Sequence, residues 1–168
     1  IDGTLYTSGV HTVPGKGTLL LVSDPVLPDN FLGSARVIST QPVVGHLNEG
    51  GPARKMATSL FNPTSSLASY AVRMCQNCSD GFISGLRVQN VGSSTATVVI
   101  TYYDNAGNQV GSEPLAIGQY LARNALSIPN GLDGSAVITS TQPIVVVVNL
   151  ANADTGKDLA MTYNAPNR

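Results

Sequence analysis

The chain repeats a long stretch of its own sequence. The segment Leu27–Ala35 recurs as Ile128–Ala136, and Ser39–Val44 recurs as Ser140–Val145, with every residue 101 positions before its counterpart. A period of about 100 residues matches the size of an immunoglobulin-like sandwich and is far longer than the unit of a solenoid. The repeat therefore predicts a β-sandwich module that occurs more than once.

The phase of the repeat predicts the domain organisation. Residues 62–168 make one full unit and the start of the next, whereas residues 1–61 match only the C-terminal half of a unit. This half-unit has no counterpart of Leu86–Tyr102. Half a sandwich leaves one sheet face uncovered and its strand edges open. We therefore expect residues 1–61 to be completed by another segment of the polypeptide or by another chain.

The residue pattern of the full unit is that of short antiparallel strands. Apolar and polar residues alternate along Gly85–Val91, and β-branched residues crowd Thr95–Tyr103, as in half-buried strands. The 17 Gly and 10 Pro residues supply the turns between such strands. The pattern predicts an all-β fold, an antiparallel immunoglobulin-like β-sandwich with one full and one half repeat. Further strands are expected at Gly118–Asn124, Gly134–Thr139, Ile144–Leu150 and Leu159–Tyr163.

The strand pattern is less regular in three places. Glu113–Pro114 is expected to disturb the strand that opens at Gln109, because proline cannot donate a hydrogen bond to a strand ladder. Ser140–Pro143 is expected to separate two strands. Leu67–Met74 has the composition of a short helix as well as of a strand, and the repeat context favours the strand.

Charged residues are sparse. They make up only 11% of the chain, with a net charge of −1, against roughly a quarter in an average soluble domain. The chain therefore lacks the basic field that would attract nucleic acid. Its longest apolar run, Ile144–Val148, is too short for a membrane helix. We expect no nucleic-acid partner and no direct membrane insertion, and a weakly charged surface lets like units pack without much repulsion.

Several motifs of the full unit resemble a known class of repeat. They are Gly134–Val145, Leu86–Ser94 with the following Val98–Gly107, and Ala160–Asn164. Together they resemble the tandem immunoglobulin-like β-sandwich repeats of large secreted bacterial cell-surface proteins. The resemblance implies an extracellular module at the cell surface and transfers no catalytic residue. The segment Cys75–Cys78 departs from the repeat pattern.

Cys75 and Cys78 are the two cysteines of the chain. An extracellular setting favours a disulfide between them, which would close a short loop. Reduced thiols or an intermolecular crosslink are the second interpretation. A metal site is the third, because zinc needs about four ligands and the two histidines, His11 and His46, lie in the half-unit. Asn77 begins an Asn-Cys-Ser sequon, which makes it a candidate glycosylation site.

The sequence offers no catalytic constellation or cofactor site. Two His and two Cys residues do not assemble a nucleophile, base and acid, and the chain has no Gly-x-Ser-x-Gly elbow. We therefore expect a protein that is not an enzyme and that holds no cofactor and no metal.

The leading prediction is a structural protein. It is a repeat segment of an extracellular filament, sheath or surface layer, assembling by β-strand complementation with copies of itself or with neighbouring repeats. The alternative is an adhesin or carbohydrate-binding accessory module of a larger secreted protein, with glycans as partners. The residues expected to matter are structural and occur in repeat-related pairs: Gly33–Ala35 and Gly134–Ala136 for close strand packing, Pro42 and Pro143 at strand starts, and Ile144–Val148 for the core.

Overall fold

The computed structural model describes residues 5–6, 9–21, 27–28, 31, 33–51, 54–60, 64–123, 126–152 and 160–167, and the side chains of all these except 49–60. These residues form nine strands, and they include no helix that could cross a membrane. The strands are β1 (His46–Gly51), β2 (Arg54–Leu60), β3 (Ser66–Cys75), β4 (Phe82–Asn90), β5 (Ala96–Tyr103), β6 (Gln109–Ile117), β7 (Tyr120–Arg123), β8 (Asp133–Asn152) and β9 (Ala160–Asn164).

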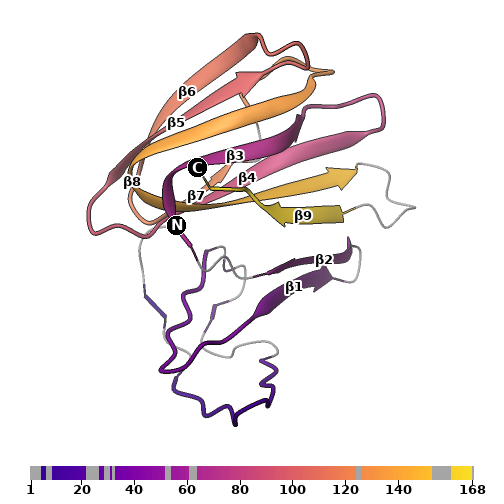
Figure 1. Cartoon of the computed structure of the whole chain (residues 1–168). Helices are drawn as coiled ribbons and strands as arrows, with labels where there is room; N and C mark the ends of the chain where they lie inside the picture. Colours follow the sequence, from indigo (N-terminus) through magenta and orange to yellow (C-terminus); the bar gives the residue numbers. More distant parts are fainter. Residues whose placement is uncertain are drawn as a thin grey trace.

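Strand β8 organises the full unit, because four other strands pair with it in antiparallel fashion. Its first part pairs with β3 and β5, and its second part pairs with β4 and β9. The seven strands β3 to β9 thus form one sheet that curls over on itself along β8 (Figure 1). The order β6-β5-β8-β3 makes one layer, and the order β7-β4-β8-β9 makes the other. The predicted all-β antiparallel sandwich is confirmed.

The hydrophobic core lies between these two layers. Alternate residues of each strand point inward, as the period of a half-buried strand requires. Ile100 and Ile138 from one layer and Val88 and Val146 from the other are fully buried. The short connection Gly118–Gln119 leads from β6 to β7 and so carries the chain from one layer to the other.

The predicted break at Ser140–Pro143 is wrong, because β8 runs through it as one strand of 20 residues. Its partner changes there instead. Ser140 is the last residue opposite β5, and Ile144 is the first opposite β4. Pro143 lies between these two ladders, where no amide hydrogen is required of it. Its carbonyl oxygen accepts a hydrogen bond of 2.9 Å from the Val91 amide.

The expected disturbance at Glu113–Pro114 is also wrong. β6 continues through both residues, and Pro114 lies opposite Val99 of β5. The strand tolerates proline because β6 pairs with β5 alone, so the missing amide hydrogen leaves no gap in a second ladder. Leu67–Met74 is part of strand β3, as the repeat context predicted.

The chain beyond β9 connects the two layers along one side. The Ala165 amide donates a hydrogen bond to the Val146 carbonyl at 2.9 Å, and the Tyr70 amide donates one to the Pro166 carbonyl at 2.9 Å. A bridge between Ser69 and Asn167 continues this contact. The edge of β3 is therefore covered by the chain itself.

The described residues before β3 contain a single strand pair, the hairpin of β1 and β2, which lies beside β9 (Figure 1). Strand β1 is the repeat counterpart of the end of β8, and each pairs with the segment that follows it, but in a different register. Asn48 lies opposite Thr58, and Asn149 lies opposite Thr162. In the later pair the Thr162 hydroxyl donates to the Asn149 side chain at 2.7 Å. Residues 33–45 precede the hairpin and form no strand. The assignment of residues 1–61 as half a sandwich remains a prediction.

Candidate functional site

The first candidate site is an apolar surface on residues 33–47, which we call the open segment. By the repeat, this segment corresponds to residues 134–148 of β8. Three large apolar residues of the open segment stand at positions whose counterparts in β8 are fully buried. The exposed fractions are 56% for Val37 and 0% for Ile138, 54% for Val43 and 0% for Ile144, and 49% for Leu47 and 0% for Val148.

This contrast has a structural cause. The residues of β8 are buried because β3, β4 and β5 pair with the strand, and a second layer covers its inner face. The open segment has the same alternation of apolar residues except that Gly45 replaces Val146, but the described structure gives it no strand partner before His46. Only where β2 supplies a partner does the chain become a strand, β1. The side chains are therefore patterned for an interior that the described chain does not provide around them.

Gly33 is a second sign of an interior pattern. Its counterpart Gly134 lies against β5, and a Cβ atom at that position would collide with the backbone carbonyl of Tyr103. Glycine is required there because a backbone group approaches closely. At Gly33 an added Cβ would meet only the ring of Phe31. The open segment thus keeps a glycine whose counterpart is needed for contact with another strand.

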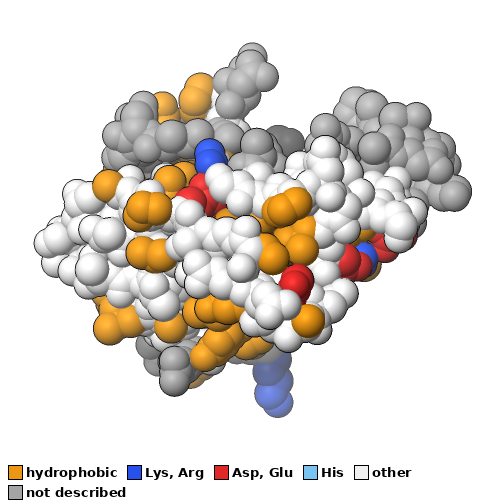
Figure 2. Space-filling model, turned by 90° about the horizontal axis from the view of Figure 1, so that it is seen from above, with side chains coloured by type: hydrophobic (Ala, Val, Ile, Leu, Met, Phe, Trp, Pro, Cys, Tyr) orange, Lys and Arg blue, Asp and Glu red, His pale blue; other side chains and the backbone are white. Residues whose placement is uncertain are grey.

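The surface around the sandwich is weakly charged. Figure 2 shows one face on which apolar and uncharged side chains predominate and acidic and basic groups are few. Val72 of β3 and Met161 of β9 are among the exposed apolar residues of the full unit. They lie on strands that already have their partners, whereas the open segment carries several exposed apolar residues in sequence.

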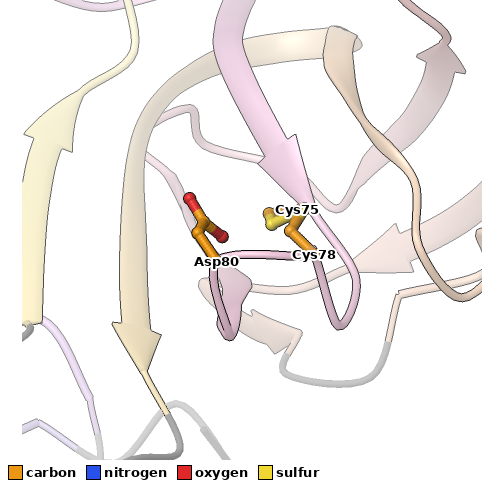
Figure 3. A group of neighbouring side chains, drawn as sticks. All are labelled: Cys75, Cys78 and Asp80. Atoms are coloured by element: carbon orange, nitrogen blue, oxygen red, sulfur yellow. A yellow bond between two sulfur atoms is a disulfide. The ribbon is translucent and has the colours of Figure 1, made fainter.

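The cysteine loop is the second candidate site. Cys75 ends β3 and Cys78 lies in the loop that follows, and a disulfide joins them across a Cα–Cα distance of 5.7 Å (Figure 3). Both cysteines are buried. The Cys78 amide donates to the Phe82 carbonyl at 3.1 Å, and the Gly81 amide donates to the Cys78 carbonyl at 2.8 Å. Gly81 has a φ of +82°, which favours glycine and allows the turn into β4.

Asp80 lies beside the two sulfur atoms, so these three side chains have the proximity of metal ligands. In the structure, however, the two sulfurs are bonded to each other, and Asp80 forms a 2.7 Å ion pair with Arg73. The hydrogen bond from Arg73 lowers the pKa of Asp80. Arg73 also pairs with Asp133 at 2.9 Å and lies over the ring of Phe82. The oxidised loop is thus a structural link between β3, β4 and the start of β8.

Asn77 lies at the tip of this loop and is exposed, with a φ of 51°. Its side-chain amide donates a 2.9 Å hydrogen bond to the Asn130 side chain. Glycosylation at Asn77 stays a prediction. Of the two histidines, both His11 and His46 are exposed, and they lie far from the cysteines in sequence. In the described part of the chain, neither histidine belongs to a cluster of potential metal ligands.

A buried polar cluster was not anticipated from the sequence. Glu113 of β6 is 7% exposed and accepts hydrogen bonds from Tyr102 at 2.5 Å, from Arg123 at 2.7 Å and from Ser127 at 3.2 Å. Burial raises the pKa of Glu113, but the hydrogen bonds from Tyr102 and Arg123 outweigh it, so the pKa lies below the ordinary value. Burial and the neighbouring carboxylate raise the pKa of Tyr102. Each member has a partner, so the cluster is a structural one.

Several solved structures are similar to this chain, whereas no family model and no curated protein matches it. One is the crystal structure of Thermotoga maritima 1070, which is 16% identical, covers 61% of this chain and 95% of that one, and has a TM-score of 0.50. Another is the Anabaena sensory rhodopsin transducer, which is 23% identical, covers 48% of this chain and 80% of that one, and has a TM-score of 0.40. The first likeness shows a shared fold. The chain is thus an all-β antiparallel sandwich with an additional hairpin and an exposed apolar segment.

Proposed function

We propose that this chain is a structural repeat segment of an extracellular filament, sheath or surface layer, in which repeats complete one another by adding β-strands. The observation that carries the proposal is the contrast between the open segment and β8. The same positions are buried in one and exposed in the other. Exposed apolar patches on soluble proteins commonly mark interaction surfaces.

The energetics favour a partner for the open segment. Fully burying a Val or Leu side chain contributes about 1.5–3 kcal/mol. Val37, Val43 and Leu47 are each about half exposed, so covering them contributes roughly 1 kcal/mol apiece. The unpaired backbone of residues 33–45 would gain strand hydrogen bonds in addition. Strand addition is a general way in which one protein supplies such partners to another.

Two further features support an extracellular structural role. The Cys75–Cys78 disulfide fits an oxidising environment, where such bonds persist. The low proportion of charged residues, 11%, limits repulsion between like units at close contact. The resemblance to secreted cell-surface repeats points the same way.

The test is self-association of the full chain, followed by sedimentation velocity over a range of concentrations and by electron microscopy. The variant Val37→Lys/Val43→Lys should weaken association at least tenfold. Val72→Lys is the matched control, because Val72 is also exposed but lies on a strand that has its partners. A wild-type chain that stays monomeric at every concentration would overturn the proposal, as would equal effects of both variants. Saturable glycan binding by such a monomer would support the carbohydrate-binding alternative.

A further inference from the structure

We infer that the open segment is the central strand of a second sandwich, and that its partner is the first half of another repeat, with strands of the β3, β4 and β5 type. This inference rests on the proposed function and deepens it, because it specifies the partner and its register. The partner is a three-stranded set rather than a single added strand.

The role of β8 in the full unit indicates what the open segment lacks. β8 has strand partners on both sides, and all of β3, β4 and β5 pair with it directly. The half-unit contains the counterpart of β8 but no counterpart of Leu86–Tyr102. Among the described residues, the open segment therefore lacks the strands that bury its counterpart.

One part of the half-unit does have a strand partner. There, β1 forms a strand with β2, as the repeat-matched end of β8 does with β9, although the registers differ, because Asn48 lies opposite Thr58 and Asn149 lies opposite Thr162. The half-unit thus becomes a strand where the described structure gives it a partner. The full unit therefore serves as a template for the kind of strand that the open segment would form and for its repeat-matched positions.

Gly33 fits the same template at the point where a neighbouring strand would approach most closely. Gly134 is needed because the carbonyl of Tyr103 in β5 leaves no space for a Cβ atom. A β5-type strand beside the open segment would bring the same carbonyl to Gly33. By the template, Ala35 would lie opposite a counterpart of Tyr102, since Ala136 lies opposite Tyr102. Val37 would lie opposite a counterpart of Ile100, since Ile138 lies opposite Ile100.

The repeat phase allows a direct experiment. A copy of residues 62–101 is placed immediately before Ile1 of the full chain, which restores the register without a linker. Amide hydrogen exchange of residues 33–45 is then measured by mass spectrometry. Exchange should be about a hundredfold slower than in the unmodified chain, because strand amides in a folded core exchange only on opening. The amides of β5 and β8 serve as the internal control for folding.

A glycine variant tests the register within the extended chain. Gly33→Val should remove the protection of residues 33–45, because its side chain would collide with the incoming strand. Unchanged exchange in the extended chain would overturn the inference, and so would equal protection by a copy with a scrambled sequence. These outcomes are separable from the proposed function. If the chain self-associates but residues 33–45 are not protected in the extended chain, the proposed function stands and the inferred partner is wrong. If residues 33–45 are protected but the chain does not self-associate, the inferred partner stands and the proposed function is wrong.

Discussion

Tyr102 donates its phenolic hydrogen to Glu113 at 2.5 Å across the β5–β6 pair. Tyr102 is fully buried, and Glu113 also accepts two hydrogen bonds from the guanidinium of Arg123. The carboxylate is thus held at the end of the core by a phenol on one oxygen and a cation on the other. A buried charge is tolerated only when its partners are in place.

Tyr102→Phe should therefore destabilise the fold. The substitution removes one donor and leaves a buried carboxylate oxygen with one partner fewer, which costs about 1–3 kcal/mol. Tyr103→Phe is the control, because Tyr103 is the next residue on the same strand and is only partly buried. The free energy of unfolding is measured in urea. Equal losses for the two variants would show that the Tyr102–Glu113 bond contributes nothing specific.

Glu113 also predicts an acid-sensitive contribution to stability. Its pKa is lower in the folded chain than its ordinary value. Such a group stabilises the fold above the unfolded-state pKa of about 4.3, and the contribution is lost as the pH falls through the folded pKa. The wild-type chain should therefore lose stability below about pH 4 more steeply than Glu113→Gln does.

The measurement is urea unfolding of both proteins from neutral to acidic pH. Asp80 and Asp104 also have lowered pKa values, so Glu113→Gln should still lose some stability as the pH falls. The informative quantity is the difference in the free energy of unfolding between the wild-type chain and Glu113→Gln, which should become smaller as the pH falls. Parallel curves over the whole range would contradict the assignment to Glu113.

The strands of the full unit were predictable because their periodicity is local. Alternation at Gly85–Val91 and β-branching at Thr95–Tyr103 locate β4 and β5. The repeat also relates the open segment to residues 134–148 of β8. The continuity of β8 through Pro143 was not predictable, because it depends on a change of partner between distant strands. Local proline chemistry alone indicates a break at that position.

The Glu113 cluster was also beyond local reasoning. Its members come from β5, β6, β7 and the loop before β8, and no sequence spacing relates them. Local chemistry at Glu113–Pro114 predicts a disturbance of the strand. One signal was present in the sequence, since a Glu amid apolar strand residues of a chain with few charges suggests a buried partner. The cysteine pair, by contrast, was predictable, because Cys75 and Cys78 are close in sequence and the resemblance to secreted repeats implies an oxidising environment.

Gly134→Ala should destabilise the chain, because the added Cβ would collide with the backbone carbonyl of Tyr103. Backbone on a central strand pair cannot move away cheaply, and overpacking of this kind costs about 1–3 kcal/mol. Gly33→Ala is the repeat-matched control, since its Cβ meets only the ring of Phe31. Thermal or urea unfolding of the full chain should show a loss for the first variant alone. Equal stability of the two variants would mean that β5 can shift away from residue 134.

The Cys75–Cys78 disulfide should stabilise the sandwich without being required for folding. The loop it closes is short, and the chain-entropy relation gives about 2 kcal/mol for such a loop. Cys75→Ser/Cys78→Ser should therefore unfold at lower urea but keep the strands, since Arg73 still joins β3 to Asp133 at the start of β8. The wild-type chain treated with reductant should match the double variant, whereas reductant should leave the double variant unchanged. Alkylation of both cysteines in the untreated, denatured chain would show that the bond is absent in solution.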